Sequence, residues 1–208
     1  MDPMIDEIQT RMLRIEQKYH SPGLPELVLR LLTAFAERGL LPDVPAADLP
    51  EIAQAARLHD LGKLSISEEI LDAPAPLSPS AEAAIREHPE MGKAVLDALF
   101  SLGPGCPKVI VYAREICLHH HERWGGEGYP DHLRGDAIPR YVQVVSLADC
   151  YDALRTPRSY RPAMVHEAAR NLILAFRCGS FDPRLLSCFA DTIDACASGL
   201  CQGSIQHG

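Results

Sequence analysis

The apolar residues of this chain recur with a helical period almost from end to end, and this pattern excludes most other architectures. Ile5, Ile8, Met12 and Ile15 form one stripe, and a second stripe runs from Leu27 toward Gly39. Spacings of three and four residues place such side chains on one face of a helix. Further helices are predicted over 163–177 and 183–197. The pattern predicts an all-α bundle of roughly eight helices.

Local signals locate the helix ends in the middle of the chain. Asp48 is expected to cap a helix that carries Ile52 and His59 and ends near Gly62. Ser80 is expected to cap the next helix, and Pro89 to open the one after it. Residues 107–120 should form another helix, whereas 125–139, rich in glycine and proline, should form a loop.

The run YVQVVSLADCYDAL after Pro139 has the composition of a β-strand at its start. Strands able to pair with it are absent elsewhere in the sequence. We therefore interpret this run as a buried helix. The organisation that follows is an N-terminal helix or extension over 1–20, a main domain over 21–198 and a short tail over 199–208.

Composition narrows the possible functions. The formal net charge is −8, which disfavours binding to a nucleic-acid polymer. No window approaches the ~18 apolar residues of a membrane span. The seven cysteines include no CxxC pair and are typical of reduced thiols. We expect a cytoplasmic protein.

Six residues with metal-binding side chains recur at helix-length intervals. Bundles build metal sites from inward-facing side chains on several helices. Four imidazoles and two carboxylates exceed the needs of one tetrahedral zinc ion, and they suit two ions such as Fe or Mn with a bridging carboxylate. Two such ions form a clamp for in-line attack on phosphorus. The six residues are His59, Asp60, His88, His120, His121 and Asp149.

Each of these residues taken alone has a simpler interpretation, as a surface or core side chain. The joint pattern favours the metal, because Asp60 and Asp149 lie inside apolar stretches and a buried carboxylate is costly without a partner. Lys63, Arg158 and Arg161 follow the proposed ligands closely in sequence. They are either solvated surface charges or a set that holds ligand phosphates, a role that suits arginine.

With these motifs in place, the sequence resembles the HD-GYP family of bacterial metal-dependent phosphohydrolases. HDLGK, then His88-Pro89, HHER, GYP and ADCYDAL occur in the order and spacing of that family, over about residues 50–190. The resemblance implies the six residues above as metal ligands, with Asp60 bridging. It also implies that Lys63 contacts the scissile phosphate or helps to protonate the leaving group, and that Arg158 and Arg161 hold the phosphates.

The same resemblance implies a substrate and partners. Family members hydrolyse cyclic di-GMP to pGpG or GMP, and some act on cyclic GMP-AMP. Gly128, Tyr129 and Pro130 would form the signature loop, close to the site and a contact surface for GGDEF-domain proteins. Catalysis would use Asp60 and Lys63.

Three departures from the family pattern stand out. Gly125 replaces an aspartate of the signature loop, and its presence is expected to loosen that loop. Gln143 replaces an arginine. The first core helix lacks its usual histidine ligand, for which His20 is a candidate replacement. Two alternative functions therefore stay open: a degenerate module that binds a cyclic dinucleotide or a GGDEF partner without turnover, and a general HD nucleotidase.

Overall fold

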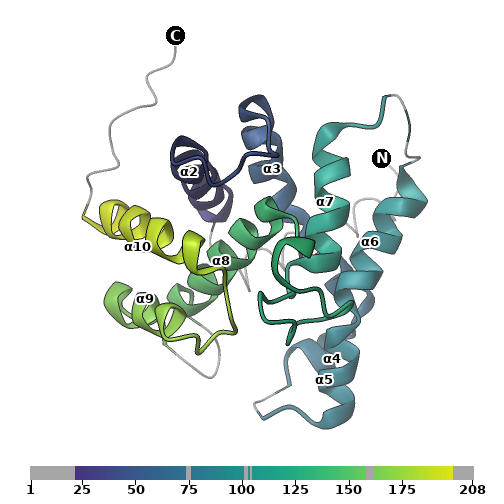
Figure 1. The fold of residues 1–208 in the computed structure, drawn as a ribbon. Coiled ribbons are helices and arrows are strands. Elements are labelled where there is room, and N and C mark those ends of the chain that lie inside the picture. The colour runs from purple at the N-terminus through teal and green to yellow at the C-terminus, as the bar shows by residue number, and fades with distance from the viewer. Residues whose placement is uncertain (1–21, 74–75, 101–102, 104, 158–161, 199–208) are drawn as a thin grey trace.

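The chain folds as an α-helical bundle in the computed structural model, which describes residues 22–73, 76–100, 103, 105–157 and 162–198 (Figure 1). Within these ranges no β-strand occurs beyond an isolated bridge between Arg177 and Gly179. The predicted all-α class is confirmed. The N-terminal stripe, His20, Arg158, Arg161 and the 199–208 tail lie outside the described residues.

The first half of the bundle supplies most of the elements that surround the site. Short 3₁₀ segments (η) alternate here with α-helices. In chain order the elements are α2 (Leu24–Glu37), η1 (Ala46–Asp48), α3 (Leu49–Ala55), η2 (Ala56–Leu58), η3 (Leu61–Ser65), α4 (Glu68–Leu71), α5 (Pro79–Arg86), α6 (His88–Leu99) and α7 (Lys108–His119).

The second half begins with η4 (Gly135–Ala137) and α8 (Arg140–Arg155), followed by α9 (His166–Leu174) and α10 (Pro183–Ala197). α8 runs through the middle of the bundle, and α2 and α9 both pack against it (Figure 1). Its valines at 142, 144 and 145 are all fully buried, which is possible only for a helix covered on every side. The β-like run is therefore helical, as predicted, because α8 is the central helix.

Three local predictions were wrong. The helix expected to continue to Gly62 ends at Ala55 and gives way to η2 and η3. Asp48 does occupy an N-cap position, but its carboxylate binds Lys108 and Tyr112 instead of the first-turn amides. The residue that caps α5 is Ser78, whose hydroxyl accepts from the Ala81 amide, and not Ser80.

The break after α3 follows from a close approach of two backbones. A Cβ atom at Gly62 would lie 1.9 Å from the carbonyl oxygen of His88. Only glycine allows η3 to approach α6 so closely. This contact fixes the position of the His59-Asp60 pair against the first turn of α6.

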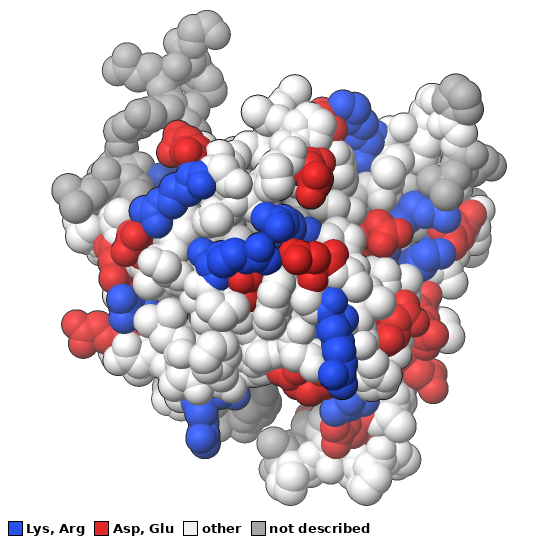
Figure 2. Space-filling model, in the orientation of Figure 1, with Lys and Arg blue, Asp and Glu red and all other residues white. Residues whose placement is uncertain are grey.

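The surface carries charges of both signs. Figure 2 shows Lys and Arg interspersed with Asp and Glu on the viewed face, rather than gathered into a continuous basic band. No helix in the described ranges is long and apolar enough to cross a membrane.

Candidate metal centre

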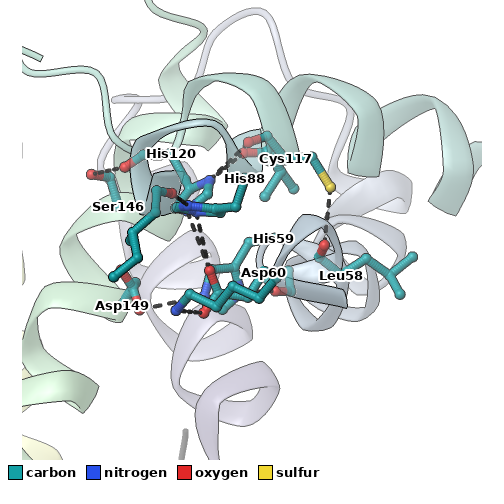
Figure 3. A network of polar contacts seen from close by, with 12 residues as sticks. Leu58, His59, Asp60, His88, Cys117, His120, Ser146 and Asp149 are labelled. Atoms are coloured by element: carbon teal, nitrogen blue, oxygen red, sulfur yellow. Dashed lines mark hydrogen bonds and ion pairs between the residues drawn. The ribbon is translucent and has the colours of Figure 1, made fainter. Parts of the chain in front are cut away.

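The six proposed ligands, from four separate parts of the sequence, come together in one cluster, in which His59, Asp60, His88 and His120 are buried. Figure 3 shows these four residues together with Asp149. His59 and Asp60 lie between η2 and η3, His88 begins α6, and Asp149 belongs to α8. His120 and His121 come directly after His119, the last residue of α7. Their polar atoms form two triads, each with all of its atoms within 4.8 Å of one another. One triad is His88, His120 and His121, and the other is His59, Asp60 and His120.

Three of the histidines are oriented in the same way. Nδ1 of His59 donates to the Ala56 carbonyl at 2.7 Å, and Nδ1 of His88 donates to the Ile85 carbonyl at 2.7 Å. Nδ1 of His120 reaches the Ile116 carbonyl at 2.9 Å. A carbonyl can only accept, so the proton must be on Nδ1 in each ring. This arrangement turns Nε2 toward the centre, as second-shell carbonyls do for metal-ligating histidines.

Two of the inward-facing nitrogen atoms lie close together, an arrangement that suits a metal ion when both rings are neutral. Nε2 of His88 lies 3.2 Å from Nε2 of His120. Burial, together with the neighbouring imidazoles, holds the pKa of His120 well below its usual range, so this ring is neutral. With Nδ1 protonated, Nε2 of His120 presents a lone pair toward the centre. A convergence of lone pairs at this distance is repulsive unless a cation lies among them, so the donor set fits a metal ion.

Asp60 belongs to the second triad and also faces His88 of the first. Its Oδ1 atom is 3.2 Å from Nε2 of His88 and 3.9 Å from Nε2 of His120, while its Oδ2 atom is 3.6 Å from Nε2 of His59. Nζ of Lys63 contacts the same Oδ2 atom. One carboxylate thus faces both groups of imidazoles with different oxygen atoms. That is the geometry required of a bridging ligand.

Asp149 completes the second group through His59. Its Oδ1 atom lies 3.5 Å from Nε2 of His59. Burial opposes protonation of His59, but the carboxylates of Asp60 and Asp149 outweigh it and raise the pKa of His59 to about 9. In the metal-free protein this imidazole carries a proton between two carboxylates, in a place where a metal ion would supply the positive charge.

The signature loop packs directly on the centre. The Tyr129 ring stacks on His121, with ring centroids 4.7 Å apart and an interplanar angle of 18°. The Tyr129–Pro130 peptide bond is cis. A Cβ at Gly128 would come within 2.5 Å of the His121 carbonyl oxygen and of the Arg123 amide nitrogen. Gly128 therefore lets the loop lie against the backbone that carries the ligands.

The loop also has a tie to the chain near α10. The Gly125 amide donates to the Ser180 hydroxyl at 2.7 Å, and the Glu127 carboxylate accepts from the Ser180 amide at 2.6 Å. A Cβ at position 125 would lie 2.5 Å from Oε2 of Glu127. Glu127 thus fills the space beside Gly125, and the loop is anchored by Glu127 and Ser180 where the sequence predicted a looser one.

Sequence reasoning assigned no role to four residues that support the centre. The carboxylate of Glu122 accepts from the Asp131 and Leu133 amides, which lie beyond Pro130 in the loop. The guanidinium of Arg123 donates to the His120 carbonyl and to Ser146, which in turn donates to the same carbonyl. Cys117 donates to the Leu58 carbonyl. The HHER motif gave a signal for Glu122 and Arg123, but Ser146 and Cys117 need the fold.

The structure also gives the contacts of three further residues, which are Gln143, His119 and Lys63. The Gln143 amide is buried and donates to the Ile138 carbonyl at 2.9 Å. His119 points away from the centre, with its Nε2 atom 3.0 Å from Asp131 and its Nδ1 atom 3.3 Å from Glu115. Lys63 reaches the centre as predicted from its spacing.

A family model described as an HD domain matches residues 6–185. The chain belongs to the HD domain family. A probable cyclic di-GMP phosphodiesterase of Vibrio cholerae is 42% identical over 65% of this chain and 31% of its own length. With the GYP motif, such relatives place the chain in the HD-GYP branch, as its motifs indicated.

Two further comparisons extend this result. A 3'3'-cGAMP-specific phosphodiesterase of the same organism is 35% identical over 65% of this chain and 25% of its own length. The structure of an HDG"Y"P protein from Bdellovibrio bacteriovorus matches with a TM-score of 0.59 at 18% identity, over 82% of this chain and 51% of that one. This second likeness concerns the fold. The chain spans about a third or less of the length of these curated relatives.

Proposed function

We propose that the chain is a metal-dependent phosphodiesterase that hydrolyses cyclic di-GMP. The observation that carries this proposal is the convergence of imidazole Nε2 atoms and carboxylate oxygens around Asp60. The enzyme class agrees with the named activity of the sequence relatives. Because the chain spans only part of those relatives, the substrate itself belongs to the proposal.

The ligand set would hold two divalent transition-metal ions, of which Fe and Mn best suit mixed imidazole and carboxylate donors. His88, His120 and His121 form one group, His59 and Asp149 the other, and Asp60 would bridge them. When bound, the two ions would supply Lewis acidity at the phosphate and a lowered pKa for a coordinated water.

The protein's own residues would orient the metal ligands and neutralise the charge of the phosphates. The backbone carbonyls of Ala56, Ile85 and Ile116 hold the imidazoles in the ligating tautomer. Lys63 lies next to Asp60 and could contact the scissile phosphate or give a proton to the leaving oxygen. Arg158 and Arg161, outside the described residues, would bind the phosphates.

The products would be pGpG, GMP or both. The similarity to a cyclic GMP-AMP phosphodiesterase supports that dinucleotide as a second substrate. A GGDEF-domain protein is the partner expected at the Gly128–Pro130 loop. These assignments, together with a location in the cytoplasm, complete the proposal.

The decisive experiment is metal analysis of protein purified without oxygen, with turnover of cyclic di-GMP measured on the same sample. We expect about two Fe or Mn ions per chain by the two-ion model and formation of pGpG or GMP that depends on them. Protein that carries both ions, binds no cyclic di-GMP and yields no product would overturn the proposal.

A second candidate function is a non-catalytic module that binds a cyclic dinucleotide or a GGDEF partner. The absence of the usual histidine at the first core helix favours it, since position 23 is glycine and position 24 is a buried leucine. Saturable binding without product, even after addition of Fe(II) or Mn(II), would support this function over the first.

A further inference from the structure

An arginine of α5 lies on the signature loop beside the centre. The guanidinium carbon of Arg86 is 4.9 Å from the centre of the Tyr129 ring. Tyr129 in turn stacks on His121, one of the proposed metal ligands. Arg86 therefore contacts a ring that itself stacks on a proposed metal ligand. Its helix, α5, comes just before α6 in the sequence.

Two contacts fix the orientation of this side chain. Nε and Nη2 of Arg86 donate to Oε1 of Glu82 at 3.2 and 3.0 Å, an i,i−4 pair on α5. The ring of Tyr129 adds a cation–π contact. Both contacts hold the guanidinium plane, so an incoming ligand would meet a pre-oriented group.

One edge of the guanidinium remains available. Nη1 has no acceptor among the residues that the structure describes, and 54% of the side chain is exposed. Arginine presents its N–H donors as a planar fork that matches two oxygen atoms of a phosphate. This edge is thus suited to bind an anion from solution.

Two cations that contact the proposed ligands, Lys63 and Arg123, already bind protein groups. Nζ of Lys63 binds Asp60, and Arg123 is occupied by the carbonyls of Cys178 and His120 and by Ser146. A cyclic dinucleotide has two phosphodiesters, and only one can be at the metal centre at a time. The second needs a positive partner outside the centre, and Arg86 would supply it together with Arg158 and Arg161, which lie outside the described residues.

We propose that Arg86 binds the second, non-scissile phosphate of the cyclic dinucleotide and so sets the affinity for substrate. This inference rests on the proposed function, because it takes its ligand from it. It assigns Arg86 to binding and not to chemistry or metal retention, since the side chain contacts none of the six proposed ligands directly.

The test compares Arg86→Gln with Arg86→Lys and with a matched control, Arg30→Gln. Arg30 forms an i,i−4 ion pair of the same kind, with Glu26, on α2. Metal content, kcat and KM for cyclic di-GMP are measured for Mn-loaded protein, and KM is repeated with added salt and with cyclic di-AMP. If the native protein binds without turnover, the dissociation constant replaces KM.

Arg86→Gln is expected to raise KM by at least about tenfold, the loss that follows removal of a charge-assisted hydrogen bond. Metal content and kcat should stay near those of the native protein, and KM should depend less on salt. Cyclic di-AMP should show the same relative loss, because a phosphate contact does not distinguish bases. Arg86→Lys should recover part of the affinity, and Arg30→Gln should behave as the native protein.

Three results would overturn the inference. KM of Arg86→Gln could equal that of Arg30→Gln, metal content could fall while KM rises, or the loss of affinity could be confined to the guanine dinucleotide, which would indicate base recognition. Each leaves the proposed function intact if the native protein is active. A native protein that neither binds nor hydrolyses the dinucleotide would overturn both.

Discussion

Two clusters of histidine and aspartate in this molecule, one buried and one partly exposed, follow opposite rules. At the metal centre, backbone carbonyls take the Nδ1 protons, and Nε2 of His88 faces Nε2 of His120 at 3.2 Å. Between α8, α9 and α10, the Tyr151 hydroxyl meets Nδ1 of His166 at 2.8 Å, and Nε2 of His166 meets Asp194 at 2.9 Å. There every donor finds an acceptor.

The difference shows how to separate a metal site from a structural polar network. Both clusters contain the same residue types, and the second is closed by Arg170, whose Nε atom donates to Asp194 at 3.0 Å. Such a network is satisfied by its own members. In the first cluster, the Nε2 atoms of several imidazoles converge beside carboxylate oxygens, an arrangement that suits a metal ion. Composition cannot distinguish the two, whereas the direction of the lone pairs can.

The largest effect is expected when the bridging position is lost. Asp60→Ala should abolish both metal binding and hydrolysis, because the two groups of imidazoles lose the carboxylate that faces both. The loss of activity should exceed the roughly 10–100-fold penalty for a second-shell change. Metal analysis and turnover of the same preparation measure it.

The control for this variant lies in the other cluster. Asp194→Ala removes a carboxylate that also contacts a histidine, yet it should leave metal content and turnover unchanged. Full metal content and full turnover in Asp60→Ala would show that the centre does not work as proposed.

The second effect concerns the close approach that brings Asp60 to His88. Gly62→Ala would place a methyl group 1.9 Å from the His88 carbonyl oxygen, so η3 and α6 must separate. We expect destabilisation of a few kcal/mol, as for overpacked cores, together with weaker metal binding. Thermal unfolding and metal titration measure the two effects.

Gly103→Ala is the matched control, because a Cβ there meets no atom of the residues that the structure describes within 4 Å. It should change stability by a few tenths of a kcal/mol only. Equal unfolding temperatures and equal metal affinity for the two variants would contradict the role given to Gly62.

The sequence was sufficient to predict the helical class, because helical period is a local property, and its motif spacing identified six proposed ligands that the fold brings together. It could not predict the tautomers, since the carbonyls of Ala56, Ile85 and Ile116 become second-shell groups only through side-chain orientation. Nor could it predict Ser146, whose contact with the His120 carbonyl joins α8 to the end of α7.

Two of the three wrong predictions have a cause in tertiary contacts. Asp48 has the sequence context of an N-cap, but two partners 60 and more residues away, Lys108 and Tyr112, take its carboxylate. The helix expected to run to Gly62 is interrupted because its continuation packs on α6. Local propensity gave the correct class of element and missed its end, since packing decides where a helix stops.

A third, smaller effect tests the polar network of Tyr151, His166 and Asp194. His166→Phe should cost about 1 kcal/mol or slightly more, because Asp194 and the Tyr151 hydroxyl each lose a hydrogen bond while both keep access to water. Metal content should be unchanged, and added Mn(II) should raise the unfolding temperature of the variant as much as that of the native protein. A loss of metal in this variant would mean that the two clusters are coupled.

The smallest effect concerns a third polar cluster, in which Asp48 contacts Lys108 and Tyr112. Hydrogen bonds from Lys108 and Tyr112 hold the pKa of Asp48 below its usual range. A carboxyl whose pKa is lowered on folding stabilises the protein above its unfolded pKa, and this contribution is lost as the pH falls through the folded pKa. Asp48→Asn should therefore be less stable than the native protein at pH 6, and the two unfolding temperatures should converge between pH 4 and 2 by this linkage. A constant difference over that range would show that packing, rather than the charge of Asp48, connects α3 to α7.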